Sequence, residues 1–238
     1  LVFFPYPISC YDSRTMEFSS PQKSKVDRIA CALGLQELFY RECIVADIHP
    51  AEVLISPCRS KVAAISCIES DGRIPEKKSF GRRNYFFLHD LIPKEETVRE
   101  FFGGRYINLY LSPWDYHFLI FPSSGKVVST FFQDGINLPV VAWDGAIFKN
   151  SKLLTVIESP LGFRYGLVMI ASWMVAGVDP RFQLETPYAR GDVFGRFRIG
   201  STVVLLFPPH SVEVLCRVGQ KIELGSPIAR WKGQGSRT

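Results

Sequence analysis

The sequence of 238 residues lacks an uninterrupted apolar run of the roughly 18 residues that a membrane-spanning helix requires. Its opening segment, from Leu1 to Ile8, is short and broken by prolines, and it lacks the basic start of a signal peptide. None of the six cysteines forms a CxxC pair, and no histidine lies at metal-ligand spacing from a cysteine. We therefore expect neither a bound metal nor a dense disulfide framework, and we expect an intracellular protein in a reducing compartment.

Concentrated charge is missing as well. The formal net charge of +5 comes from basic residues spread along the chain. A nucleic-acid partner is not expected, because that function requires basic residues clustered on one face. A mild positive excess would assist peripheral binding to an anionic membrane surface, although an ordinary soluble surface slightly rich in Lys and Arg also explains it.

Apolar and turn-forming residues are abundant. Apolar residues make up 47% of the chain, with 18 glycines and 16 prolines, which favours a β-rich domain with many turns over a helical bundle. We expect an α+β fold that is mostly β. Predicted helices cover 23–40 and 94–101, and a loop is predicted over 70–84. Predicted strands cover 53–55, 62–65, 106–111, 126–132, 146–148, 153–157 and 165–175, separated by Asp-Gly, Lys-Asn and Leu-Gly turn signals.

A weak internal repeat lies near the C-terminus. Residues 191–197 (GDVFGRF) are echoed by residues 219–228 (GQKIELGSPI), and each copy has paired glycines around a short stretch. Such glycines permit positive φ at both ends of a tight β connection. The pattern resembles the hairpins of biotinyl and lipoyl carrier domains, which are antiparallel β-sandwiches, although no lysine occupies a carrier-type tip. We therefore predict an antiparallel barrel-sandwich over residues 53–238, preceded by a partly helical adaptor over residues 1–52.

Two longer motifs are more specific. Residues 110–117 read YLSPWDYH, and residues 191–203 read GDVFGRFRIGSTV before running into LLFP. In this order the two motifs resemble the phosphatidylserine decarboxylase family, whose corresponding patterns are close to YLSPxDYH and GxxxGxFxxGSTVxxLF. The resemblance is good from about Tyr85 to Ile228, so the catalytic domain it implies falls within residues 53–238.

The resemblance implies a self-cleaving enzyme. Family members cut their own backbone before the serine of the GST motif, which here is the Gly200–Ser201 bond. The serine hydroxyl attacks the preceding carbonyl, and elimination from the resulting ester leaves a pyruvoyl cofactor made from Ser201. This cofactor forms an imine with the substrate amino group and accepts the electrons released with carbon dioxide. Gly200 suits a reactive peptide bond, because it has no side chain to obstruct the attack.

Other site residues follow from the same motifs. His117 ends the first motif, where an imidazole would protonate the product or steady the departing carboxylate; without the resemblance, a histidine hydrogen-bonded at a strand end is the better interpretation. Trp114, Phe118 and Thr202 flank these groups and are predicted to contact the substrate. The family substrate is the aminophospholipid phosphatidylserine, and some relatives decarboxylate a free aromatic amino acid such as tryptophan.

Two positions depart from the family pattern. Larger family members activate the serine with an Asp and a second His, in the manner of a serine-protease triad. Arg59 stands where the Asp is expected, and Ile120 stands where the second His is expected. A cation cannot orient an imidazole as a carboxylate does, and isoleucine cannot accept a proton. A shifted alignment would instead make Asp71, in an Asp-Gly pair, the counterpart of the missing Asp.

These departures leave two functions open. In one, other groups activate Ser201 and the protein is a pyruvoyl-dependent decarboxylase of phosphatidylserine or of a soluble amino acid. In the other, Ser201 is never activated and the protein is an unprocessed pseudoenzyme or interaction module of the same fold. By resemblance we expect a homodimer. The apolar residues around His117 are a candidate membrane-docking face, with core packing as the alternative; they are Trp114, Phe118, Leu119 and Phe121.

Overall fold

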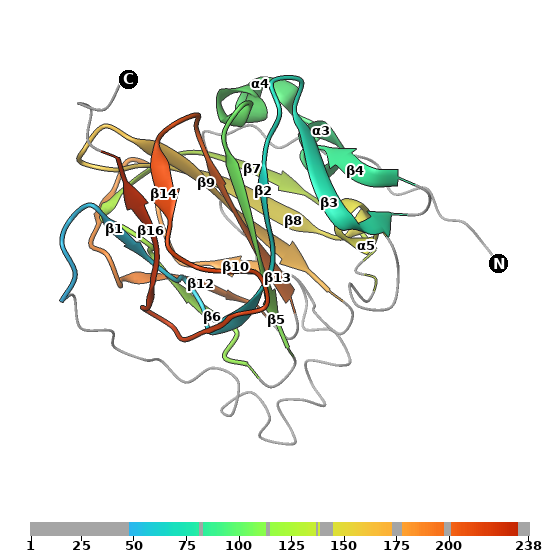
Figure 1. Ribbon diagram of the computed structural model, residues 1–238. Helices are drawn as coiled ribbons and strands as arrows, with labels where there is room; N and C mark the ends of the chain where they lie inside the picture. Colours follow the sequence, from blue (N-terminus) through green and yellow to red (C-terminus); the bar gives the residue numbers. More distant parts are fainter. Residues whose placement is uncertain are drawn as a thin grey trace, which may run out of the picture.

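A computed structural model describes residues 48–80, 83–112, 115–136, 138, 145–172, 178–197 and 201–232 (Figure 1). Its largest element is an eight-stranded antiparallel sheet with β13 near its middle. In spatial order the strands are β11 (Pro187–Tyr188), β7 (Gly125–Gln133), β8 (Lys152–Glu158), β9 (Arg164–Ala171), β13 (Ser201–Phe207), β5 (Arg105–Leu111), β2 (Ser60–Cys67) and β15 (Lys221–Ile222).

Smaller elements cover both faces of this sheet. Two three-stranded sheets lie over one face, and a hairpin with short helices lies over the other (Figure 1). The small sheets are β1 (Val53–Ile55), β16 (Pro227–Trp231) and β14 (Val212–Val214), and β10 (Val178–Pro180), β12 (Val193–Phe197) and β6 (Phe118–Ile120). Opposite them lie β3 (Arg73–Phe80), β4 (Arg83–Phe87), α3 (Leu88–Leu91), α4 (Glu95–Val98), the 3-10 turn η1 (Arg99–Phe101) and α5 (Ala146–Lys149).

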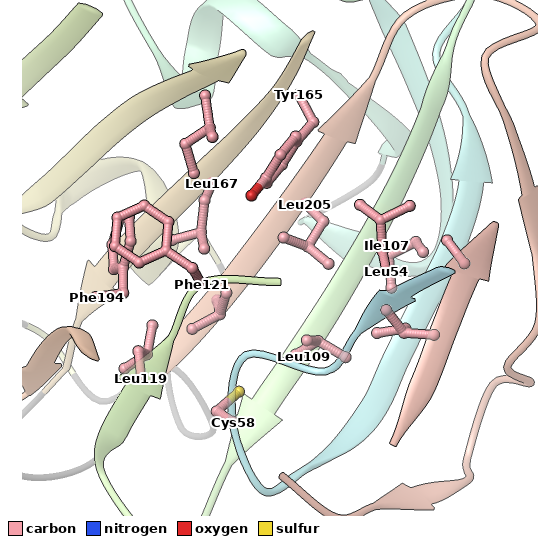
Figure 2. Packing of buried hydrophobic residues seen from close by; sticks show 14 of the residues in the cluster. Leu54, Cys58, Ile107, Leu109, Leu119, Phe121, Tyr165, Leu167, Phe194 and Leu205 are labelled. Atoms are coloured by element: carbon pink, nitrogen blue, oxygen red, sulfur yellow. The ribbon is translucent and has the colours of Figure 1, made fainter. Parts of the chain in front are cut away.

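The alternation of side chains along β13 explains why the sheet is buried on both faces. Val203 and Leu205 belong to the core shared with Leu119 and Phe194 of the small sheets (Figure 2). Val204, whose side chain points to the opposite face, belongs to the second core, which lies beneath the helices. A strand with two buried faces reads as a continuous apolar run rather than an alternating one, as the sequence VVLLF does.

The predicted fold class is confirmed. The protein is mostly β, with antiparallel sheets packed as a sandwich and a few short helices. The described strands do not close into a barrel. Most of the predicted strands are present, and the predicted helix over 94–101 is found as α4 followed by η1. The predicted helix over 23–40 lies outside the described residues, so the adaptor and the domain boundary after residue 52 stay predictions.

Two local predictions are wrong. The apolar run at 146–148 forms helix α5, whose N-cap Gly145 has a φ of 76° and whose Ala146 and Ile147 are buried. Three apolar residues cannot distinguish a strand from one buried helical turn. The predicted loop over 70–84 instead contains β3 and the start of β4. Among the side chains of this hairpin that the structure describes, Ile74 and Phe86 are buried in the second core.

The paired glycines of the repeat serve two different needs. Gly191, Gly219 and Gly225 have positive φ, as predicted for tight connections. Gly195 does not, so the prediction is wrong there. A Cβ at Gly195 would lie 2.8 Å from the carbonyl oxygen of Asp179, so glycine is required at this position because β10 and β12 approach closely.

Candidate active site

Ser201 is the first residue of β13, and both neighbouring strands hold its backbone. It lies opposite Leu111 of β5 and opposite Ala171 of β9. Thr202, the next residue, is buried between Tyr110 and Ile170. The Gly200–Ser201 bond therefore lies at one end of the large sheet, where β13 begins. Gly200 itself is outside the described residues.

A backbone hydrogen bond joins His117 to β12, the strand that precedes the Gly200–Ser201 bond in the chain. Its carbonyl oxygen accepts a hydrogen bond from the backbone N–H of Phe197, at 2.8 Å. Phe197 precedes Ser201 by four residues, so their Cα atoms are at most about 14 Å apart, since each residue extends a chain by at most ~3.6 Å. On its other side, His117 follows Leu111, the strand partner of Ser201, by six residues. The backbone thus brings the two predicted catalytic residues to the same end of the sheet.

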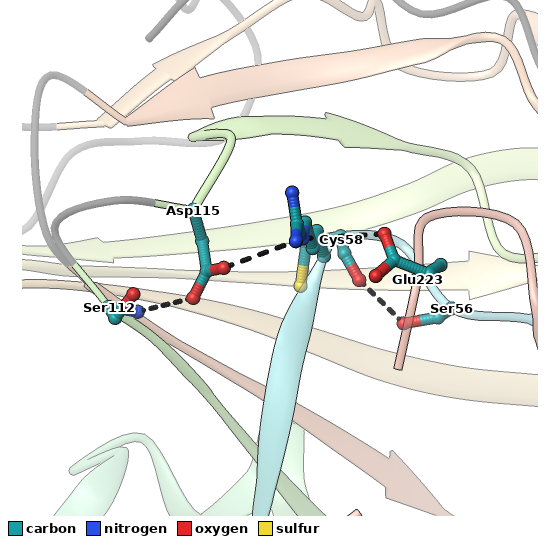
Figure 3. A network of polar contacts seen from close by, with 6 residues as sticks. Ser56, Cys58, Ser112, Asp115 and Glu223 are labelled. Carbon is teal, nitrogen blue, oxygen red and sulfur yellow. Dashed lines mark hydrogen bonds and ion pairs between the residues drawn. The ribbon is translucent and has the colours of Figure 1, made fainter. Parts of the chain in front are cut away.

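The turn between Leu111 and His117 is held by Asp115. The Asp115 carboxylate accepts a hydrogen bond from the Ser112 N–H at 2.8 Å, and the Asp115 N–H donates to the Ser112 carbonyl at 3.0 Å (Figure 3). A short acidic side chain that accepts a hydrogen bond from the backbone of the same turn is a common turn stabiliser. Asp115 therefore fixes the path of the chain immediately before His117.

Arg59 contacts this turn from the start of β2. Its Nε lies 3.7 Å from a carboxylate oxygen of Asp115 and 3.3 Å from one of Glu223 (Figure 3). Its guanidinium lies 5.7 Å from the ring centroid of Tyr116. Arg59, at the position where the family Asp is expected, therefore bridges two carboxylates, one of them two residues before His117.

The environment of His117 keeps its imidazole neutral. The residue is fully buried, and burial lowers its pKa from 6.5 to about 4, although contacts with Asp115 oppose the change. At neutral pH the imidazole is therefore uncharged, and its low pKa makes it a weaker base than an exposed histidine. The neighbouring thiol of Cys58 is not a competing nucleophile, because burial raises its pKa to about 12.

The positions that depart from the family pattern are now located. Ile120 is buried in β6, and its N–H donates to the Pro57 carbonyl at 3.0 Å, so the loop that carries Arg59 does lie beside the His117 segment. Asp71 follows the far end of β2, because Cys67 pairs with Arg105 whereas the start of β2 pairs near Leu111. The alternative in which Asp71 replaces the missing Asp is therefore wrong.

The proposed substrate contacts and docking face can also be placed. Phe118, Leu119 and Phe121 are buried, so core packing explains them. Trp114 lies outside the described residues. Within the described ranges, no helix is long and apolar enough to cross a membrane. Nor do the described residues gather three or more His, Cys, Asp or Glu side chains into a metal-binding group.

The sequence prediction missed Asn150. Its amide nitrogen donates to the carbonyl of Ala171 at 2.7 Å and to that of Leu138 at 2.8 Å, and its oxygen accepts from the Leu138 N–H at 2.6 Å. In the sequence, the Lys-Asn pair at this position indicates only a turn. No feature of the local sequence indicates that the side chain reaches two distant segments.

Comparisons with known proteins agree with the motifs. The family profile described as phosphatidylserine decarboxylase matches residues 35–230. The phosphatidylserine decarboxylase proenzyme of Anaeromyxobacter sp. (strain K) is 30% identical over 208 residues, which cover 76% of this chain and 72% of that protein. The proenzymes of Bacillus cereus and Bacillus thuringiensis are 32% identical over 168 residues, or 66% of this chain. The match spans 63% of each Bacillus protein, slightly less than two thirds.

Proposed function

Because the chain belongs to the phosphatidylserine decarboxylase family, a family of carboxy-lyases, we propose that it cuts its own Gly200–Ser201 bond and decarboxylates phosphatidylserine to phosphatidylethanolamine. The observation that carries this proposal is the placement of Ser201 at the start of a central strand, at the same end of the sheet as His117. Two predicted catalytic residues that are far apart in the sequence are thus gathered by the fold.

The surroundings of residue 201 fit a pyruvoyl group. After cleavage, this residue becomes a new N-terminus, which would fray if nothing held it. Pairing with Leu111 and Ala171 holds its backbone whether or not the bond to Gly200 is intact. When present, the pyruvoyl group supplies the carbonyl that accepts electrons as carbon dioxide leaves.

His117 is the residue that we propose as the base for self-cleavage. A neutral imidazole removes the proton from the Ser201 hydroxyl, and the oxygen attacks the Gly200 carbonyl carbon as the peptide C–N bond breaks. The resulting ester is then lost by elimination, which leaves a carboxylate on Gly200 and a dehydroalanine at residue 201. Water converts the dehydroalanine to the pyruvoyl group with release of ammonia. Self-cleavage happens once per molecule, so a slow rate without the family Asp and second His suffices.

Intact mass measurement tests the cleavage. Purified protein should separate under denaturing conditions into residues 1–200 and a 38-residue fragment (238 − 200 = 38) with a blocked N-terminus. Ser201→Ala should remain a single 27.0 kDa chain, and His117→Gln should be cut far more slowly. Carbon dioxide release from phosphatidylserine, compared with release from free tryptophan, then decides between a lipid and a soluble substrate.

One observation favours a second candidate, an unprocessed protein of the same fold. Arg59 and Ile120 replace both groups that activate the serine in larger family members, and Arg59 is engaged with Asp115 and Glu223. A wild-type chain that stays uncut after long incubation, like Ser201→Ala, would select this candidate.

A further inference from the structure

The loop that carries Arg59 is fixed to two other parts of the chain. The Ser56 N–H donates to the Ser226 carbonyl at 2.7 Å, which ties the loop to the turn before β16. On the other side, the Ile120 N–H donates to the Pro57 carbonyl at 3.0 Å, which ties the loop to β6. Arg59 itself lies directly before the first residue of β2. Its side chain therefore starts from a fixed point between these segments.

From this point the Arg59 side chain contacts both residues that precede His117. Its Nε lies 3.7 Å from the Asp115 carboxylate, and its guanidinium carbon lies 5.7 Å from the centroid of the Tyr116 ring. The second distance is within the range of a cation–π interaction. A third contact, of 3.3 Å, joins Nε to the carboxylate of Glu223. One guanidinium thus connects the end of the YLSPWDYH motif to the C-terminal part of the chain.

The two carboxylate oxygens of Asp115 have different partners. Oδ2 accepts the Ser112 N–H at 2.8 Å and closes the turn on itself, whereas Oδ1 faces Arg59. The first contact shapes the turn, and the second attaches it to a separate segment. On the other side of the turn, the Phe197 N–H donates to the His117 carbonyl at 2.8 Å. The residue that we propose as the base therefore lies between two attachments.

Each contact of Arg59 is weak by itself. The side chains of Arg59 and Glu223 are 43% and 68% exposed, and ion pairs between exposed groups typically contribute under ~1 kcal/mol to stability. A small loss of stability can still accompany a large loss of rate, because a displacement of about 1 Å at a reacting group can slow a reaction by about 100-fold. For these contacts, the position that they impose therefore matters more than the energy that they contribute.

We propose that Arg59 is a positioning residue for His117, an inference that rests on the proposed function. Arg59 holds the turn before His117 and ties it, through Glu223, to the segment that begins at residue 201. The processing Asp of larger family members is expected at this position, and a guanidinium cannot act on an imidazole as that carboxylate does. Arg59 acts instead through the backbone of the turn, which directs the imidazole toward residue 201.

Arg59 also changes the charge that His117 experiences. Burial lowers the pKa of His117, and the Asp115 carboxylate opposes part of that change. Removing the cation beside Asp115 leaves its negative charge uncompensated, so the pKa of His117 should rise. The other ionisable groups on neighbouring segments are the same in both proteins and do not contribute to the difference; they are Cys58, Tyr110, Tyr116, Asp192, Arg196 and Glu223.

NMR titration of the imidazole tests the positioning without requiring cleavage. In the uncut Ser201→Ala background, Arg59→Gln should shift the ring signals of His117 and move their titration midpoint to higher pH. His117→Gln identifies the signals that belong to this residue. Unchanged ring signals and an unchanged midpoint in Arg59→Gln would overturn the proposal.

The matched control is Arg73→Gln. The Arg73 side chain is 42% exposed, forms an ion pair with Glu69 and lies 5.5 Å from the centroid of the Tyr85 ring. It therefore reproduces the contacts of Arg59 at a site beyond the far end of β2. Arg73→Gln should leave the His117 signals unchanged. Equal shifts in the two variants would overturn the proposal, because they would reflect a general effect of losing an arginine.

The cleavage rate separates this inference from the proposed function. Arg59→Gln should be cut about tenfold more slowly than wild type, with the acid limb of its pH profile moved to higher pH. Arg59→Lys should keep the wild-type pH profile, because a cation stays beside Asp115, and Arg73→Gln should keep the wild-type rate. Wild-type protein that stays uncut, while its His117 signals respond to Arg59→Gln, would refute the proposed function and support the positioning. Wild-type protein and Arg59→Gln that are cut equally fast would refute the positioning alone.

Discussion

The side-chain amide of Asn150 donates a 2.7 Å hydrogen bond to the carbonyl of Ala171, and Ala171 is the residue opposite Ser201 in the sheet. Asn150 is fully buried and also pairs with the backbone N–H and carbonyl of Leu138. One side chain therefore connects Leu138 to Ala171 of β9, the strand that pairs with Ser201. Because Ala171 is the strand partner of Ser201, we expect Asn150 to act as a positioning residue.

We expect Asn150→Ala to destabilise the protein and to slow self-cleavage. The change removes three hydrogen bonds to the backbone of Leu138 and Ala171, of which the bond to the Ala171 carbonyl is buried. Losing the partner of a buried polar group costs about 1–3 kcal/mol. Urea unfolding of the uncut Ser201→Ala background measures the stability, and fragment mass over time measures the rate. Glu185→Gln, which loses only an exposed ion pair with Lys126, should change stability by under ~1 kcal/mol. Equal effects of the two changes would contradict the role of Asn150.

A pH dependence follows from His117. Its pKa is lowered to about 4 in the folded protein by burial, whereas an unfolded histidine titrates near about 6.5. Between these values the unfolded state binds more protons, so stability rises with pH through this window and is lost as pH falls from about 6.5 to 4. The loss is at most about 3 kcal/mol, since one pKa unit is worth about 1.4 kcal/mol.

Denaturant unfolding of Ser201→Ala at a series of pH values measures this slope, and adding His117→Gln should flatten it. Cleavage by wild-type protein should also persist to lower pH than an ordinary imidazole base would allow. A cleavage rate that halves near pH 6.5 would show that His117 is not held neutral by burial.

Much of the fold could be predicted because the strands carry strong local signals. β13 has a continuous apolar run, and the glycines at 191 and 219 adopt the positive φ that their turns require. The errors at 146–148 and 70–84 have a common cause, which is that short or polar segments derive their structure from tertiary contacts. Phe86, for example, packs on Tyr106 and Phe148, which lie far away in the sequence.

The functional site, too, could be predicted only in part. The motifs gave Ser201 and His117, but the contacts that support them come from distant segments. Asn150 reaches Ala171 across 21 residues, and the Phe197 N–H bonds to the His117 carbonyl from a strand far along the chain. Sequence spacing carries no information about register between strands that are far apart along the chain, so neither relationship could be derived without the structure.

Substitutions of Arg59 test what its departure from the family pattern does to stability and to cleavage. Arg59→Gln removes a half-exposed pair of contacts with Asp115 and Glu223, so stability should fall by less than about 1 kcal/mol. Arg59→Asp restores the family residue type but places a third carboxylate beside two others, and we expect it to destabilise more than Arg59→Gln. Thermal unfolding at low and high salt measures both, and salt should narrow the difference because it screens repulsion. A faster cleavage rate in Arg59→Asp alone would show that the carboxylate is what this site lacks.

Arg190 also provides a test of stability, because its charged guanidinium is buried and donates hydrogen bonds to backbone carbonyl oxygens. Its Nη1 donates to the carbonyls of Pro50 at 2.6 Å and Val53 at 2.7 Å, and its Nη2 donates to that of His49. The planar guanidinium reaches several carbonyls at once, whereas a lysine presents one compact ammonium. We therefore expect Arg190→Lys to keep the charge but lose about 2 kcal/mol of stability. Amide hydrogen exchange should show faster opening at Val53, whose N–H bonds to the Pro50 carbonyl, while the strand pairing around Ser201 stays protected. Equal protection at Val53 in both proteins would mean that the arginine does not hold this segment.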